Sequence, residues 1–102
     1  MIEGFLTYLR SEKRYSELTV RAYGDDIRQF VLFCCGVTAP PTPEEEADIL
    51  RSFDPTLSEG NDLRGWIMHL TGTKNLSARS VNRKISSVKS LYRYLRKKGI
   101  VA

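Results

Sequence analysis

The last part of the chain carries nine basic side chains and no acidic one between Lys74 and Ala102. Residues 44–62 show the reverse pattern, with seven acidic side chains and a single basic one, Arg51. The whole chain has a formal net charge of +4. An uncompensated run of positive charge attracts polyanions, although the same run also suits a basic face that meets only solvent. The basic stretch is therefore the first candidate for a binding surface.

Apolar residues recur at helical spacing through this stretch and predict one long helix, capped by Ser77 and stopped at Gly99. Its apolar side consists of Val81, Ile85, Val88, Leu91, Tyr92 and Leu95. Its polar side consists of Arg79, Asn82, Arg83, Ser86, Ser90, Arg93 and Lys97. Opposite charges four residues apart normally stabilise an exposed helix by about 0.2–0.5 kcal/mol. This helix contains no acidic residue, so we expect its counter-charge to come from outside the protein.

Small polar side chains lie between the basic ones, at Ser77, Ser80, Asn82, Ser86 and Ser87. Such groups can donate to phosphate oxygens or approach base edges without holding a helix away from a groove. The N-terminus of the helix adds backbone N–H groups suited to a phosphate, and a DNA major groove about 12 Å wide admits one α-helix. The pattern favours contact with duplex DNA. The alternative is that the serines serve only solubility.

The rest of the sequence predicts further helices and no strand. Apolar spacing predicts helices over about residues 2–13 and 17–35, the second capped by Ser16 and stopped at Gly36. A proline-rich loop follows, then a short helix over about 44–53 whose glutamates suit the positive end of a helix. Turn residues at 54–55 and 59–61 precede a helix capped by Asp62, which ends at 72–75. The fold class is all-α, with four main helices and one short extra helix.

Length and composition limit the class of protein. The 102 residues suit one domain, with 41% hydrophobic and 27% charged residues, too balanced for a disordered chain. No run is apolar enough to span a membrane, and the N-terminus has no signal-peptide pattern. The adjacent Cys34 and Cys35 form no disulfide framework, so we expect a reducing, cytoplasmic setting.

Two stretches resemble a known family. Residues 16–30 resemble the pattern S-x-x-T-x-x-x-Y-x-x-D-[LI]-x-x-F in the N-terminal core-binding, SAM-like domain of tyrosine recombinases and phage integrases. Residues 76–95 resemble the final helix of that domain, which ends in an aromatic-x-x-Leu segment. The opening Phe5-Leu6-x-Tyr8-Leu9 and the segment 62–64 follow in the expected order, so the resemblance covers essentially the whole chain.

The resemblance implies a small orthogonal helical bundle that forms half of a clamp around duplex DNA. It places Thr19, Arg21 and Ala22 near the backbone or groove, and Ser77, Arg79, Arg83 and Ser86 at phosphates and bases. Helical periodicity adds Asn82, Ser90 and Arg93 to the second set. For Thr19 a role at the start of its helix is an equal alternative, and Tyr23 is expected in the core.

The resemblance also implies that residues 1–102 are the core-binding domain alone. The family's nucleophilic tyrosine and its arginines, lysine and histidines belong to a separate C-terminal domain, so we expect this chain to be inert by itself. Its implied partners are double-stranded DNA, the catalytic domain of the same parent chain and further copies on DNA. Bacterial or phage origin follows from the same family.

Several residues suggest other chemistry and are set aside. His69 with Cys34 and Cys35 could suggest zinc, but adjacent cysteines lack the spacing that wraps a tetrahedral site. The consecutive glutamates 44–46 point around a helix rather than at one ion. Trp66 is expected to anchor the core. We therefore expect no metal and no cofactor.

Two other function classes fit the same sequence. A helical protein-interaction module could use the basic face to bind an acidic partner. An RNA-binding helical domain would show tighter binding to structured RNA. Titration with duplex DNA at two salt concentrations separates these classes.

Overall fold

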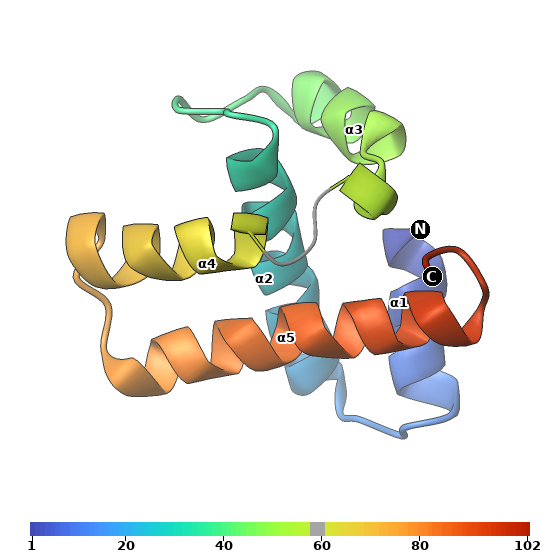
Figure 1. The fold of residues 1–102 in the computed structure, drawn as a ribbon. Helices are drawn as coiled ribbons and strands as arrows, with labels where there is room; N and C mark the ends of the chain where they lie inside the picture. Colours follow the sequence, from blue (N-terminus) through green and yellow to red (C-terminus); the bar gives the residue numbers. More distant parts are fainter. Residues whose placement is uncertain (58–60) are drawn as a thin grey trace.

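A computed structural model describes residues 1–57 and 61–102; within these ranges the chain is helical and contains no strand. The α-helices are α1 (Ile2–Ser11), α2 (Glu17–Cys34), α3 (Pro43–Ser52), α4 (Asn61–Met68) and α5 (Ala78–Lys97). A 3₁₀ turn, η1 (Pro55–Leu57), follows α3, and a π-helical turn, η2 (His69–Thr73), continues α4. Figure 1 shows α5 crossing α2 steeply, as in an orthogonal bundle. The all-α prediction is confirmed.

Local signals set most of the helix ends. The hydroxyls of Ser16 and Ser77 accept hydrogen bonds from the backbone N–H groups of Thr19 and Ser80, at 3.2 and 3.3 Å. Both predicted N-caps are therefore confirmed. After α2 and α5, Gly36 and Gly99 adopt φ values of 72° and 75°, a region that glycine reaches without a steric penalty.

The short extra helix is a full ten residues long, the same length as α1. Thr42 and Glu45 form a capping box: the Thr42 hydroxyl accepts from the Glu45 N–H, and the Glu45 carboxylate accepts from the Thr42 N–H. Pro43 occupies the first turn, where its missing N–H costs nothing. The bond to the Thr42 backbone, with the bond to its side chain, lowers the pKa of Glu45.

The predicted ends of α1 and α4 need correction. Helix α1 stops at Ser11, two residues early, and the chain then turns through Arg14 at φ 55°. Because α4 begins at Asn61, Asp62 lies in its first turn and is not the cap. The predicted turn at 59–61 falls partly outside the described residues.

The end of α4 lies where the sequence predicts it, although its form differs from a regular α-helix. The helix runs on as η2 to Thr73 and so ends within residues 72–75. The Thr71 hydroxyl donates to the Ile67 carbonyl at 2.9 Å, a side-chain bond that competes with the regular backbone pattern and bends a helix. The direction of the chain changes at Asn75, at φ 53°, the last residue of the predicted stop.

The core lies where α2 and α5 cross, and α1 and α4 cover its edges. Helix α2 contributes Ile27 and Phe30, α1 contributes Phe5 and Leu9, and all four are fully buried. Trp66 of α4 is 2% exposed and meets Phe30 edge-on at 5.3 Å between ring centroids. Trp66 therefore anchors the core, as predicted.

The burial of Tyr23, in the same region, differs from the prediction. Tyr23 was expected in the core, but its side chain is only half-buried and packs at the core's margin. Its ring meets Tyr15, near the end of the α1–α2 connection, edge-on at 5.7 Å between ring centroids.

Helix α3 packs on α2 with a half-buried apolar side formed by Ile49 and Leu50. Arg28 of α2 lies 3.8 Å from Glu46 of α3. Farther along, the Tyr92 hydroxyl of α5 donates to the Pro55 carbonyl of η1 at 3.0 Å. No helix in the described ranges is long and apolar enough to cross a membrane.

Replacing Ser77 by alanine is expected to reduce the free energy of unfolding by about 1 kcal/mol, because α5 loses its N-cap. Chemical denaturation followed by circular dichroism measures the change. Ser86→Ala is the matched control, since Ser86 is exposed within the same helix and alanine is a strong helix former. Equal losses in the two variants would contradict the capping role.

Candidate nucleic-acid interface

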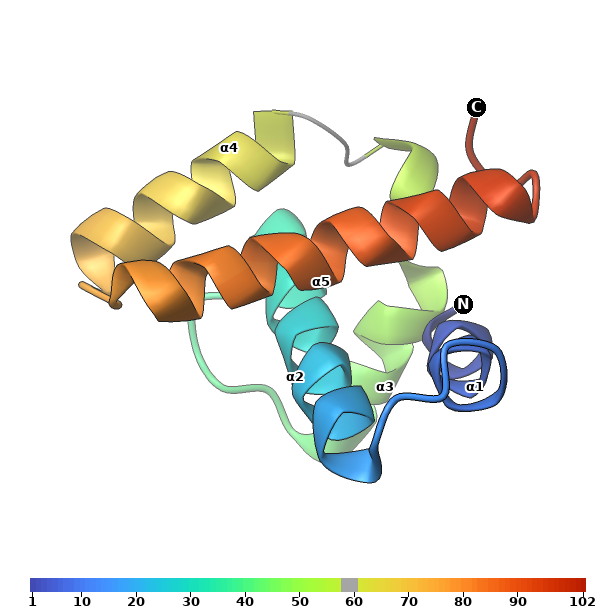
Figure 2. The same ribbon diagram turned by 90° about the horizontal axis from the view of Figure 1, so that it is seen from below.

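The polar side of α5 faces solvent along its whole length. Arg79, Asn82, Arg83, Ser86 and Arg93 are exposed, and Ser90 is half-buried. In Figure 2 the molecule is viewed from below, and both α5 and the start of α2 lie toward the reader on this side. We call this surface, formed by the exposed side of α5 with the first turns of α2, the basic face.

The counter-charge of α5 comes partly from within the protein, which corrects the expectation from sequence. Asp26 of α2 is fully buried and pairs with two cations of α5. Arg83 donates to its carboxylate through Nε at 3.1 Å and Nη2 at 2.8 Å, and Lys84 donates through Nζ at 2.9 Å. Buried charge is stable only when paired in this way.

Two more polar groups complete the cluster around Asp26. Ser87 Oγ donates to the carboxylate at 2.8 Å, and Lys84 Nζ also donates to Gln29 Oε1 at 2.7 Å. Every buried side-chain nitrogen or oxygen of the described residues has a hydrogen-bond partner. The cluster therefore joins α2 to α5 without a buried polar group left unsatisfied.

Arg83 belongs to both the cluster and the surface. Its side chain is 50% exposed while two of its nitrogens bind Asp26. The hydrogen bond to Asp26 raises the pKa of Arg83, against an opposing effect of burial, and the charges of Asp26 and Asp25 add to the rise. Asp26 thus fixes the orientation of Arg83 and offsets part of its charge.

The positive charges of the other predicted arginines are not offset by an ion pair within the described residues. Arg21, Arg79 and Arg93 make no ion pair with any carboxylate in residues 1–57 and 61–102. A cation that faces solvent without a partner can meet an external phosphate at little cost in desolvation. These three residues are the strongest phosphate-binding candidates on the basic face.

The remaining predicted residues on α2 and α5 have local structural tasks as well. Thr19 is half-buried, and its hydroxyl lies 3.0 Å from the Ser16 hydroxyl. Ala22 is half-buried beside the exposed Arg21. Ser77 caps α5 by accepting a hydrogen bond from the Ser80 N–H.

Ser87 was a sequence candidate for phosphate contact, but it is fully buried and donates to Asp26. Sequence reasoning also missed the buried pair of Asp26 and Lys84, yet a signal for it exists. Asp26 lies directly beside the apolar stripe of α2, next to Ile27 and four residues before Phe30. Lys84 and Ser87 hold equivalent positions on α5. An acid and a base that fall on the inward sides of two packed helices indicate a buried pair, because neither is found buried alone.

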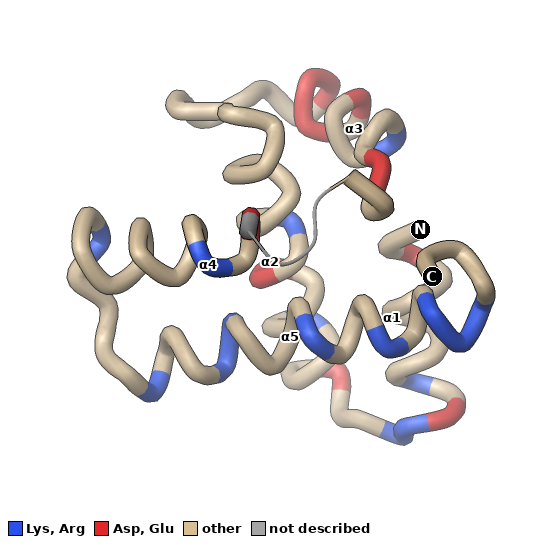
Figure 3. Tube along the Cα trace, viewed as in Figure 1, with Lys and Arg blue, Asp and Glu red and all other residues tan. Residues whose placement is uncertain are grey.

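The glutamates of α3 and the cations of α5 occupy different sides of the domain. Figure 3 shows the glutamates of α3 gathered above α2, whereas the cations of α5 follow the lower side of the molecule. Helix α3 packs on α2 and leaves the exposed residues of α5 uncovered. The glutamates of α3 therefore do not neutralise the basic face.

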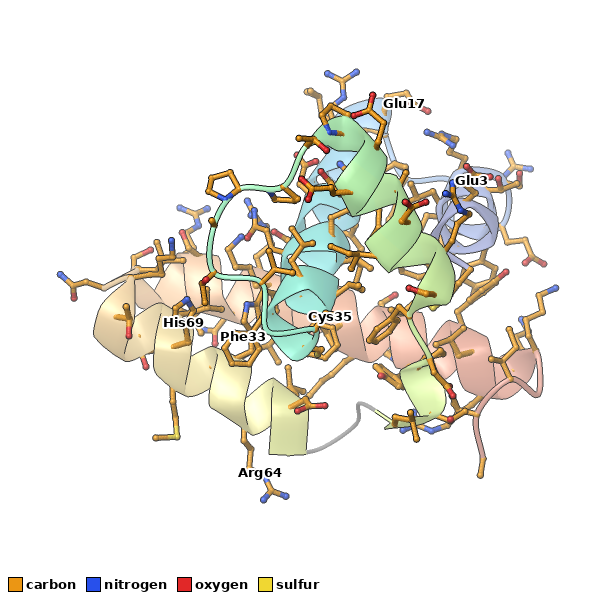
Figure 4. All side chains as sticks on the ribbon, turned by 90° about the horizontal axis from the view of Figure 1, so that it is seen from above. Glu3, Glu17, Phe33, Cys35, Arg64 and His69 are labelled. Atoms are coloured by element: carbon orange, nitrogen blue, oxygen red, sulfur yellow. The ribbon has the colours of Figure 1, made fainter. Side chains whose placement is uncertain are left out.

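His69 has a packing role. Figure 4 shows Phe33 and His69 turned toward one another between α2 and η2, and their ring centroids lie 5.4 Å apart. Within the part of the chain that the structure describes, no three histidine, cysteine or acidic side chains gather as a metal site would require.

These features define a small all-α domain with an exposed basic face on its longest helix. Its sequence matches the family described as phage integrase, N-terminal SAM-like domain, over residues 1–100. The chain belongs to this family.

Curated relatives of the chain are tyrosine recombinases. It is 31% identical over 97 residues to tyrosine recombinase XerC of Leptospira interrogans, covering 95% of this chain and 27% of the relative. The corresponding protein of Staphylococcus saprophyticus is 36% identical over 92 residues, covering 90% and 26%. That of Chlorobaculum parvum is 34% identical over 103 residues, covering 99% and 28%. The chain thus spans about a quarter of the length of these relatives, and no solved structure matches it significantly.

Proposed function

We propose that this domain binds duplex DNA as the core-binding half of a site-specific tyrosine recombinase or integrase. The observation that carries the proposal is the basic face, where Arg21, Arg79 and Arg93 have no internal carboxylate partner in the described residues. Helix α5 would lie against the major groove, with Asn82, Ser86 and Ser90 at base edges or phosphates. Membership of the integrase family supports the same assignment.

The domain would position DNA and leave the chemistry to another domain. The relatives are about three and a half times as long and are named tyrosine recombinases. We propose that residues 1–102 form one core-binding domain and that strand exchange belongs to a catalytic domain elsewhere in a parent protein. On DNA, several copies would assemble in the bacterial cytoplasm, a reducing setting that suits the two free cysteines.

Binding to a duplex of about 20 base pairs should depend strongly on salt. With four to six phosphates neutralised, the slope of log K against log salt is expected to be about −4 to −5. Affinity would then fall roughly 10²- to 10³-fold between 50 and 200 mM salt. Fluorescence anisotropy with a labelled duplex measures both quantities.

Two competitors separate the rival functions. Heparin matches DNA in charge density without its groove, so equal competition by heparin and duplex would favour a module that binds an acidic protein. A structured RNA that competes better than duplex DNA would favour an RNA-binding domain. Preferential competition by duplex DNA supports the proposal.

A further inference from the structure

A notch of about 280 Å³ opens beside α5, where the α1–α2 connection approaches the middle of that helix. The first wall is aromatic and basic and comes from three segments, with Tyr8 of α1, Lys13 and Tyr15 of the connection, and Tyr23 of α2. The second wall comes from α5 alone, with Ser86, Ser90 and Arg93. Because the second wall belongs to the basic face, the notch is continuous with it.

The backbone of the connection fixes the first wall. Arg14 turns at φ 55°, and the N–H groups on either side of it return to α1. Lys13 N–H donates to the Tyr8 carbonyl at 3.3 Å, and Tyr15 N–H donates to the Leu9 carbonyl at 3.0 Å. The side chains of Lys13 and Tyr15 are thus presented by an ordered turn rather than by a loose loop.

The Tyr23 phenol of the notch is a hydrogen-bond donor at neutral pH. Burial raises the pKa of Tyr23, and the neighbouring Tyr15 and the carboxylate of Asp26 raise it further, while Arg93 acts in the opposite direction. Tyr23 therefore keeps its hydroxyl proton. The edge-on contact with Tyr15 holds both rings in place.

The lining selects a small anion with several acceptor oxygens. Lys13 and Arg93 bring positive charge from opposite walls, and serine and tyrosine hydroxyls supply further donors. No acidic side chain lines the notch. Neither Lys13 nor Arg93 has an ion-pair partner in the described residues. A phosphodiester group meets all of these conditions, whereas a cation or an apolar ligand meets none.

We propose that this notch seats a single phosphate of the DNA backbone, shared between Lys13 and Arg93. The inference rests on the proposed function, and it extends the basic face across α5 to the α1–α2 connection. Seating one phosphate at this point would fix the depth and rotation of α5 in the groove, since phosphate contacts set register while base contacts read sequence.

The test uses the double variant Lys13→Gln/Arg93→Gln and its two single variants, each titrated with the labelled duplex at several salt concentrations. If the two cations share one phosphate, replacing both of them removes only one phosphate contact. The double variant should therefore flatten the salt slope by about one unit, and each single variant by less. Two separate phosphates would flatten it by about two units in the double variant.

Matched controls separate an effect of the notch on DNA binding from an effect of net charge. Arg51→Gln, on α3, changes the net charge by the same amount as each single variant and should leave affinity and slope unchanged. Tyr15→Phe keeps the ring and removes one donor, and should weaken binding without altering the slope. Nuclear magnetic resonance titration with inorganic phosphate should shift the ring signals of Tyr15 and Tyr23, whereas chloride at equal ionic strength should not.

The possible outcomes distinguish a failure of this inference from a failure of the proposed function. If the wild-type domain binds duplex DNA and the double variant binds it with the same affinity and slope, the notch is not a phosphate site while the function stands. A loss of two slope units overturns the shared phosphate. If the wild-type domain binds no duplex, both fail, even where inorganic phosphate shifts the tyrosine signals.

Discussion

Replacing Asp26 by alanine is expected to lower the free energy of unfolding by about 3–5 kcal/mol. Asp26 is fully buried and accepts hydrogen bonds from Arg83, Lys84 and Ser87. Arg83 can turn toward water, but the Lys84 side chain is 8% exposed and would be left as a buried charge without a carboxylate. A domain of this size is stable by roughly 5–15 kcal/mol, so the variant would be close to unfolding at ambient temperature. Urea denaturation followed by circular dichroism measures the loss.

The neighbouring carboxylate provides the control. Asp25→Ala removes an exposed ion pair with Arg28 and should cost less than about 1 kcal/mol. Adding Lys84→Met to the Asp26→Ala variant should recover part of the loss, because the buried ammonium group is then gone. Similar losses for Asp25→Ala and Asp26→Ala would show that the cluster does not hold α2 to α5.

Reversing the charge of Arg79 is expected to weaken duplex binding by about tenfold or more at 0.1 M salt. Arg79 is exposed at the start of α5 and has no carboxylate partner in the described residues. Arg79→Glu removes one phosphate contact and places a negative charge toward the next. The variant should fold at least as stably, since an acidic side chain suits the first turn of a helix. Anisotropy titration measures the affinity, and thermal unfolding checks the fold.

Arg51→Glu is the matched comparison, because it changes net charge by the same amount on α3, above α2 in Figure 3. If net charge alone governed attraction to DNA, both variants would lose affinity equally. A loss confined to Arg79→Glu supports the basic face, and an unchanged affinity for Arg79→Glu removes α5 from the interface.

The fold was predictable because local signals and apolar spacing agree for most helices. Ser16, Ser77, Gly36 and Gly99 act as the sequence suggests. The end of α4 within 72–75 was predictable, but its π-helical form was not, because the Thr71 hydroxyl bonds back to Ile67. The helical spacing of apolar residues contains no information about side chains that compete with the backbone for hydrogen bonds.

The candidate interface was predictable only in part. Helical spacing places Arg79 and Arg93 on the solvent side of α5, where the structure has them. It could not pair Arg83 with Asp26, which lies 57 residues earlier, because that contact depends on how α2 and α5 cross. The notch was missed for the same reason, since Lys13 and Arg93 meet only through the packing of three helices.

The placement of α3 above α2, away from the exposed side of α5, has a kinetic consequence. Opposite charges on two sides of one small body give it an electric dipole, and a highly charged rod exerts a torque on such a dipole before contact. The domain would approach DNA already oriented, with the cations of α5 toward the duplex and the glutamates of α3 away from it. Removing the negative charges of α3 would weaken this orienting torque, even though α3 packs away from the basic face.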